Sequence, residues 1–330
     1  MACSHNTWLG LLAFAAAGCG GPPSAKLDVP FWPVAVGSYA EVKVYDASYV
    51  WTPSYPTITS TSLSDPTVAR VLSHTETPAE LWNNISASDT VYLLGLRAGQ
   101  TNLSTDADFS DGSHRSATAT VAVKSIDALA PATDCDGPVD LPLRTFPGDA
   151  LMFEAALTNG GERLAGYIPG AIVGDGIVCG PGEHVLLADL STVTSCAWTA
   201  PATGGSTTLS SPQLPAFSTQ LDTYAPADVT WIGIEPGFGE EYGVVGNSPG
   251  IKTYVKLAQG RPCKSMPVQA MTKSPSVCTG PNGETEWSSD SNHFVEYLGT
   301  AVGDCVLALG AAGAASYPTT LHIPIRLPSQ

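Results

Sequence analysis

The chain has 330 residues, with 14 Lys and Arg against 30 Asp and Glu, and a formal net charge of −16. This charge opposes nonspecific binding to nucleic acid or anionic lipid, because both depend on basic patches. Charged residues make up only 13% of the chain, whereas 33 glycines and 27 prolines punctuate it. Such usage predicts short strands joined by turns, in two or three domains of about 100 to 150 residues each.

The N-terminus begins with an uncharged, apolar run from Trp8 to Gly18. This run is too short for a membrane-spanning helix of about 20 residues, but it has the length of a signal-peptide core. Its end, AAGC at residues 16–19, resembles a bacterial lipobox. In lipoproteins that carry this motif, the cysteine is acylated and becomes the mature N-terminus.

The resemblance implies that residues 1–18 are a lipoprotein signal peptide and that Cys19 is the lipid anchor. Residues 19–26, rich in Gly and Pro, then form a flexible tether. Gly20, not Asp, follows the cysteine, which by analogy with lipoprotein sorting implies the outer membrane. Two alternatives stay open: plain secretion after cleavage at the alanines 15–17, and a short buried helix.

Residues 27–126 alternate between apolar and polar side chains, as half-buried strands do. In the stretch SYAEVKVYD, Ala40, Val42 and Val44 share one face, and residues 117–123 repeat the alternation. Clusters of Pro, Asn and Ser separate these strands at the spacing of a β-sandwich.

Small and apolar residues within this region follow a definite order: Asp65, Val68, Ala69, Gly95, Ala98, Gly99 and Thr101. This order, followed by a turn into an alternating final strand, resembles a bacterial immunoglobulin-like (Ig-like) domain of group 2. The resemblance implies a spacer or adhesive module on a bacterial surface, and it brings no catalytic residues with it.

The end of the chain repeats part of this arrangement. LGLRAGQTNL at 94–103 and LGTAVGDCVL at 298–307 share the pattern L-G-x-x-x-G-x-x-x-L, and an alternating strand follows each. We therefore predict a second Ig-like sandwich at residues 230–330, with 252–258 as an inner strand. Pro324 cannot donate a ladder hydrogen bond, so its strand should lie at an edge or bulge there.

The middle third, residues 128–229, is predicted to be a third Ig-like sandwich, although a single larger β unit over 128–330 is an alternative. It holds eleven acidic residues and only two basic ones, Arg144 and Arg163. A dispersed acidic surface of this kind favours solubility. The predicted fold is thus all-β, with tandem Ig-like β-sandwiches after an N-terminal signal peptide.

Six cysteines follow Cys19 in the chain: Cys135, Cys179, Cys196, Cys263, Cys278 and Cys305. An even number in an exported protein predicts disulfides, and none of the spacings suits a zinc site. We expect Cys179 to pair with Cys196 and Cys278 with Cys305, each bond joining neighbouring strands. The partners of Cys135 and Cys263 stay undecided, because three cysteines per domain require either a bond between domains or two free thiols.

One motif points to hydrolase chemistry, the G-x-S-x-G at residues 246–250. A nucleophile elbow needs the backbone N–H of the residue after the serine, and Pro249 has none. A strand-like stretch follows where the motif requires a helix. The motif is therefore interpreted as a turn.

A second motif, STDADFSDGS, offers Asp106, Asp108 and Asp111 as a weak candidate calcium site. The run slips by one residue from EF-hand spacing and lacks the distal Glu of that loop. A hairpin turn at Asp111-Gly112 is the preferred interpretation. We predict no metal site otherwise, and no cofactor.

These observations predict a noncatalytic lipoprotein at the outer membrane or cell surface, in which Ig-like domains act as a spacer or an adhesion module. The expected partners are an unidentified surface protein or glycan, and the membrane through the lipid anchor. A carbohydrate-binding or enzyme-accessory protein is the main alternative, and it requires exposed aromatic side chains. The candidates for these are Trp32, Trp51, Tyr55 and Trp82. A secreted hydrolase is a third possibility and needs a concave site with convergent polar groups.

Overall fold

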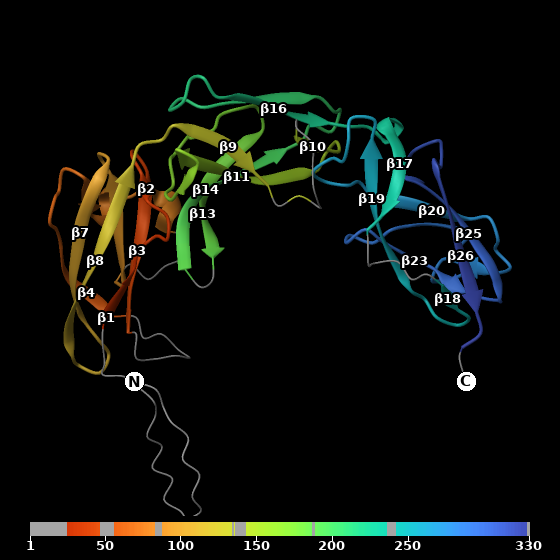
Figure 1. Ribbon diagram of the computed structural model, residues 1–330, viewed down its shortest axis with the longest axis horizontal. Helices are drawn as coiled ribbons and strands as arrows, with labels where there is room; N and C mark the ends of the chain where they lie inside the picture. The colour runs from red at the N-terminus through yellow and green to blue at the C-terminus, as the bar shows by residue number, and fades with distance from the viewer. Residues whose placement is uncertain are drawn as a thin grey trace, which may run out of the picture.

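A computed structural model describes residues 25–46, 56–82, 88–133, 135, 143–186, 189–235 and 242–328, with the backbone alone at 74, 82, 183–186 and 189–190. The described chain is almost entirely β-structure, and its helices are short 3₁₀ turns. Three β-sandwiches follow one another along an arch, and the described chain starts and ends on the open side of that arch (Figure 1). The predicted all-β fold of tandem β-sandwiches is confirmed. Within these residues no helix is long and apolar enough to span a bilayer.

The first sandwich packs two four-stranded sheets around a core of aliphatic side chains. One sheet has the order β1 (Ala25–Asp28), β3 (Tyr39–Asp46), β6 (Thr90–Gly95) and β5 (Ala69–Leu72). The other has the order β2 (Val34–Ala35), β8 (His114–Lys124), β7 (Gly99–Asp108) and β4 (Thr57–Leu63). The 3₁₀ turns η1 (His74–Glu76) and η2 (Ala79–Trp82) follow β5. Strand β3 buries Ala40, Val42 and Val44, as its alternating pattern predicts.

The middle sandwich buries Trp198 at the centre of its core. Its larger sheet contains β12 (Glu162–Leu164), β11 (Ala150–Asn159), β14 (Asp189–Thr199) and β13 (Ile177–Leu186), with β9 (Ala128–Ala132) also paired to β11. Its smaller sheet has the order β10 (Leu143–Thr145), β16 (Ser218–Thr223) and β15 (Ser206–Ser210). The 3₁₀ turn η3 (Pro226–Asp228) leads out of this sandwich.

The third sandwich has a three-stranded and a five-stranded sheet. The smaller has the order β17 (Val229–Ile234), β19 (Gly250–Leu257) and β23 (Phe294–Glu296), so β19 is the inner strand. The larger has the order β18 (Gly243–Val244), β26 (Thr319–Arg326), β25 (Gly303–Ala311), β20 (Val268–Thr272) and β22 (Glu286–Ser288). Strands β21 (Cys278–Thr279) and β24 (Leu298–Gly299) pair with each other. Strand β18 pairs with β26 only at Ile325 and Arg326. Pro324 therefore lies in a part of β26 that pairs with β25 on one side and has no β18 partner on the other.

The repeated glycine pattern makes the same contact in the first and third sandwiches. A Cβ atom on Gly99 would lie 2.9 Å from the Val68 side chain, and one on Gly303 would lie 3.1 Å from the Val277 side chain. Each glycine therefore lets the start of a long strand approach a valine in the turn that precedes a short strand, β5 in the first sandwich and β21 in the third. The sequence pattern corresponds to a shared packing arrangement.

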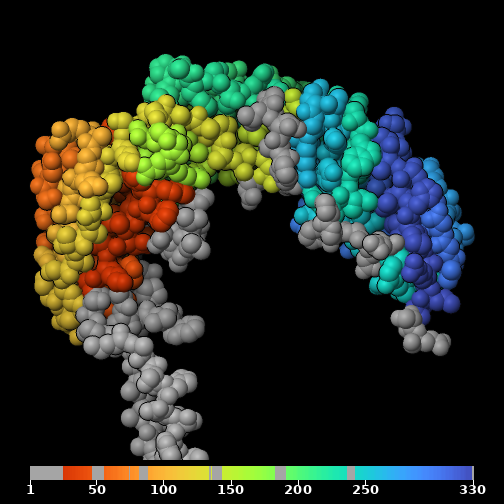
Figure 2. Space-filling model, viewed as in Figure 1, coloured from red at the N-terminus to blue at the C-terminus, as the bar shows by residue number. Residues whose placement is uncertain are grey.

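The first junction, between the first and middle sandwiches, is made by backbone groups. Tyr39 and Tyr167 exchange N–H to carbonyl hydrogen bonds of 2.8 and 2.7 Å. Gly166, at φ 121°, packs so closely on Ser38 that a Cβ would lie 2.0 Å from the serine Oγ. Ala35 of β2 belongs to the hydrophobic core of the middle sandwich. Figure 2 shows the two sandwiches in continuous contact here.

The second junction, between the middle and third sandwiches, is covalent. Cys135 and Cys263 form a disulfide across 128 positions of sequence. The N–H of Cys263 donates to the carbonyl of Arg144 at 2.9 Å, and Cys263 is fully buried in the middle core. The two cysteines that spacing left undecided thus make the bond between sandwiches.

The structure also contains the disulfides Cys179–Cys196 and Cys278–Cys305, the two expected pairs. Cys179 and Cys196 lie opposite each other on the neighbouring strands β13 and β14. The expectation of neighbouring strands is wrong for the other bond, because β21 pairs with β24 whereas β25 pairs with β20 and β26. That bond links strands that share no ladder, through side chains buried in the core.

Candidate binding cavity at the second junction

The three aspartates of the weak calcium candidate each bond to other side chains. Asp106 accepts hydrogen bonds from Ser116 at 2.5 Å and Ser60 at 2.6 Å, which hold the pKa of its carboxyl below the ordinary value. Asp108 contacts the His114 ring at 2.7 Å. Asp111 belongs to the turn between β7 and β8, the predicted hairpin. Within the described chain no cluster of His, Cys, Asp and Glu is suited to a metal ion.

The lipid-anchor candidate Cys19 lies outside the described residues. Ser248 of the G-x-S-x-G motif lies between β18 and β19, where Gly246 has a φ of 84°. Strand β19 follows the motif directly, in place of the helix that a nucleophile elbow needs.

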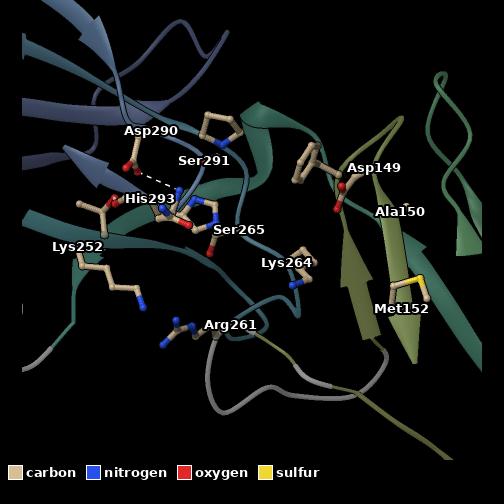
Figure 3. A pocket seen from close by; sticks show the side chains of 14 residues that line it. Asp149, Ala150, Met152, Lys252, Arg261, Lys264, Ser265, Asp290, Ser291 and His293 are labelled. Carbon is tan, nitrogen blue, oxygen red and sulfur yellow. Dashed lines mark hydrogen bonds between the residues drawn. The ribbon is translucent and has the colours of Figure 1, made fainter. Parts of the chain in front are cut away.

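A cavity of about 730 Å³ opens at the second junction, a size within the roughly 300 to 1,000 Å³ of ligand pockets. We call it the junction cavity. The middle sandwich contributes Phe146, Asp149, Ala150 and Met152, and the third contributes Lys252, Thr253, Arg261, Lys264, Ser265, Pro267, Asp290, Ser291, Asn292 and His293. Figure 3 shows these residues around one hollow between the two sandwiches.

Basic side chains are concentrated along this cavity. Residues 252–264 contain four of the 14 Lys and Arg of the chain and no acidic residue. Three of the four, Lys252, Arg261 and Lys264, line the cavity. Their nitrogen ends gather on one side of the hollow in Figure 3, away from the carboxylates of the lining aspartates. The lining of the junction cavity thus carries three basic and two acidic side chains, so basic groups are concentrated there relative to the rest of this acidic protein.

The interdomain disulfide positions the segment that carries two of these charges. Cys263 lies between Arg261 and Lys264, and the carbonyl of Arg144 accepts the N–H groups of Cys263 and Lys264 at 2.9 and 3.3 Å. Tyr224 donates its hydroxyl to the Lys264 carbonyl at 2.8 Å. The backbone of this segment is thus fixed to the middle sandwich on one side of the cavity.

Arg261 is oriented by two neighbours. Its guanidinium forms an ion pair with Glu235, and both side chains are largely buried. The same guanidinium lies 4.1 Å from the centre of the Tyr254 ring. A planar guanidinium stacked on an aromatic ring keeps its orientation, so its donors are set in advance for a planar anion.

The loop between β22 and β23 forms another wall of the junction cavity. Asp290 accepts hydrogen bonds from the N–H groups of Asn292 at 2.9 Å and Phe294 at 2.7 Å, which closes the loop tightly. His293 has a φ of 64°, and among the described non-glycine residues it is alone in having a positive φ. Residues other than glycine adopt this conformation at a cost of roughly 1 to 3 kcal/mol, and such residues cluster at binding and catalytic sites.

The second lining aspartate also has a local role. Asp149 accepts the hydroxyl hydrogen of Thr145 at 2.6 Å at the start of β11. Both lining carboxylates therefore stabilise the turns that carry them. Because they lie on the far side of the hollow from the basic side chains, the charge across the cavity is uneven.

An aromatic pair lies next to Arg261 on the outer face of the small sheet, with the tryptophan exposed and the tyrosine half-buried. Trp231 is 43% exposed, and its ring meets the Tyr254 ring edge to face at 6.2 Å. A Cβ on Gly233 would lie 2.2 Å from the Tyr254 ring, so the glycine makes room for that ring across the sheet. The cations of the cavity and an exposed indole are thus linked through Arg261 and Tyr254.

The aromatic candidates chosen from sequence lie elsewhere. Trp32 is half-buried at the first junction, where the Arg163 guanidinium lies 4.5 Å from its ring centre. Trp51, Tyr55 and the Trp82 side chain lie outside the described part of the chain. Sequence reasoning missed Trp231 and the basic cavity, although the run of four basic residues without an acid was a visible signal.

No protein-family model matches the chain, and no curated protein matches it. Among solved structures the chain is similar to SGBP-B from the mixed-linkage glucan utilization locus of Bacteroides ovatus, in complex with a mixed-linkage heptasaccharide. The identity is 12% over 91% of this chain and 66% of that chain, with a TM-score of 0.29. It is also similar to domains 4–9 of the surface layer protein SbsC, at 13% identity over 92% and 50% of the two chains and a TM-score of 0.28. A third similarity is to the four N-terminal Ig domains of Dscam1, at 10% identity over 93% and 73% and a TM-score of 0.25. The chain thus spans under two thirds of the first structure and half of the second.

Proposed function

We propose that this chain is an exported, noncatalytic protein that is anchored to the outer membrane through a lipid on Cys19 and holds a binding site at the cell surface. Its partner would be a surface protein or a glycan. The observation that carries the proposal is the fixed geometry of both junctions between sandwiches. An arch with fixed junctions keeps its binding site at a set distance and orientation from the first sandwich, which follows the tether.

The physical basis of this rigidity differs at the two junctions. Backbone hydrogen bonds such as the Tyr39–Tyr167 pair cannot rotate away as side-chain contacts can. The Cys135–Cys263 bond excludes separation of the other two sandwiches. Flexible linkers between domains allow independent motion, whereas these contacts favour a spacer that moves as one body.

The finer parts of the proposal follow from the sequence. Residues 1–18 would be a signal peptide, and 27–126 an Ig-like domain of the bacterial group 2 type. Two further Ig-like domains would cover 128–229 and 230–330. The strand after Ser248, where a hydrolase requires a helix, supports a noncatalytic role.

Acylation of Cys19 tests the anchor. We expect the full-length protein, expressed in a Gram-negative host, to fractionate with outer membranes and to show the intact mass of a chain that starts at an acylated Cys19. The Cys19→Ser variant should lack the lipid mass and leave the membrane fraction. Cys3→Ser is the matched control, because it removes a cysteine from the same leader and should leave acylation unchanged.

A wild-type protein that is unacylated and soluble would exclude the anchor and favour plain secretion. Acylation that persists in Cys19→Ser would contradict the proposed attachment residue.

A further inference from the structure

We propose that the junction cavity binds an acidic oligosaccharide, a short sugar chain that carries carboxylate groups. This inference rests on the proposed binding function and adds the chemical class of the ligand. It does not depend on the lipid anchor.

The first support is the distribution of charge. In a chain of net charge −16, the cavity collects Lys252, Arg261 and Lys264 from a segment without acidic residues. Basic groups gathered on one side of a hollow attract an anionic group, and the surrounding negative charge disfavours long polyanions such as nucleic acid. The charge pattern thus favours a ligand with few, localised negative groups.

The second support is the geometry of the donors. The Arg261 guanidinium is oriented by Glu235 and by the face of Tyr254 at 4.1 Å. Lys264 is held beside the buried disulfide, and Lys252 comes from the neighbouring strand β19. Carboxylates are recognised by charge-assisted hydrogen bonds from such groups, and a pre-oriented guanidinium favours a planar anion.

The third support concerns the uncharged part of the ligand. The loop with the strained residue His293 places Ser291 and Asn292 at the cavity wall, and both are exposed. A hydroxyl and an amide can each donate and accept, which suits sugar hydroxyl groups. The exposed indole of Trp231 lies beyond Tyr254 and offers an apolar face for the C–H side of a sugar ring.

The volume sets the length of the ligand. A hollow of about 730 Å³ suits a short saccharide segment and not a folded protein domain. A longer chain would leave the cavity across Arg261 and reach Trp231. Charge recognition inside the cavity and ring stacking outside it therefore act on different parts of one chain.

The test is a glycan array of paired acidic and neutral glycans, probed with the full chain, followed by titration calorimetry with the strongest glycan and its methyl ester. We expect the bound glycans to carry carboxylates and the ester to bind at least about tenfold more weakly. Hexaglutamate serves as an acidic peptide probe. Preference for the peptide would overturn the saccharide class.

Substitutions assign the binding to the cavity. Lys252→Gln/Lys264→Gln should weaken binding by about tenfold for each lysine removed. Lys256→Gln/Lys273→Gln is the matched control, because it removes the same charge from two exposed lysines outside the cavity lining. Trp231→Ala should weaken binding of longer glycans only, and circular dichroism checks that each variant folds.

An array without acidic glycans among its ligands, equal binding of acid and ester, or full binding by the cavity variant would each overturn the inference. These failures are distinct from failure of the proposed function, because membrane fractionation of wild type and Cys19→Ser is measured independently of glycan binding.

Discussion

The first and third sandwiches share one construction and differ in how it is secured. In each, a glycine at the start of a long strand packs against a valine of the turn before a short strand, Gly99 on Val68 and Gly303 on Val277. In each, the valine carbonyl accepts two N–H groups from the turn before that glycine, at 2.9 and 3.1 Å in the first sandwich and at 2.8 and 3.3 Å in the third.

The difference lies two residues after each glycine. Thr101 of the first sandwich accepts a hydrogen bond from the N–H of Asp65 at 2.9 Å. Cys305 occupies the same place in the third sandwich and forms a disulfide with Cys278, whose counterpart in the first is Ala69. The same packing is thus secured by a hydrogen bond in one sandwich and by a covalent bond in the other.

The disulfides of the described chain all lie in the two sandwiches that build the junction cavity. A disulfide restricts the unfolded chain and holds its neighbours in the native state. Covalent restraint is therefore concentrated around the candidate binding site, and the sandwich nearest the N-terminus depends on hydrogen bonds and packing.

Removal of the third sandwich's bond should have the largest effect. Cys278→Ala/Cys305→Ala should lower the free energy of unfolding of that sandwich by about 3 kcal/mol, since the bond closes a 27-residue separation. Hydrogen exchange should locate the loss in the third sandwich and leave the first unchanged. A uniform loss across both sandwiches would contradict the comparison.

Transfer of the bond to the first sandwich should have the next largest effect. Ala69→Cys/Thr101→Cys places cysteines at the positions that match Cys278 and Cys305, and we expect a disulfide to form. The expected gain is about 2 kcal/mol, which is about 3 kcal/mol from chain restriction less about 1 kcal/mol for the lost threonine hydrogen bond. Denaturant unfolding with and without reductant measures it. Two free thiols in the folded variant would show that the geometries differ.

The paired glycines allow a finer comparison. Gly99→Ala and Gly303→Ala should each cost roughly 1 to 2 kcal/mol from overpacking. The cost should be greater for Gly99, because its contact would be 2.9 Å against 3.1 Å, whereas the φ angles of 158° and 156° are nearly equal. Thermal unfolding of the two variants ranks them. The reverse order would mean that Val277 adjusts less readily than Val68.

The smallest expected effect depends on pH. The hydrogen bond to Asp108 raises the pKa of His114 on the hairpin of the first sandwich. This stabilisation is fully present below the unfolded pKa of about 6.5 and is lost as the pH rises through the raised folded pKa. NMR titration should show a higher pKa for His114 in wild type than in Asp108→Asn. Asp304→Asn, which removes the carboxylate 2.7 Å from His322 in the third sandwich, is the matched control and should leave His114 unchanged.

Alternation and glycine placement made much of the fold predictable. Ala40, Val42 and Val44 are buried as a period of two requires. The shared L-G-x-x-x-G pattern predicted that the first and third sandwiches are built alike, because its second glycine, Gly99 or Gly303, makes the same close contact with a valine in each. Both signals are local in the chain and can be seen without three-dimensional information.

The junction cavity was not predictable in the same way. Its walls come from residues more than a hundred positions apart, such as Asp149 and Lys264, at a junction that the Cys135–Cys263 bond and backbone hydrogen bonds hold together. Pairing across domains has no local signature, since six cysteines allow fifteen arrangements. The basic segment 252–264 can be recognised in the sequence, but acidic residues elsewhere in the last third offset its charge when the net charge of the whole third is considered.

The Cys135–Cys263 bond also changes what a protease can do to this chain. The two cysteines are separated by 128 positions, so the polypeptide between them forms a closed covalent ring. A single peptide-bond cleavage anywhere inside that ring opens it and releases no fragment. The third sandwich stays tied to the N-terminal end after such a cut, and only a reductant or a second cleavage can set it free.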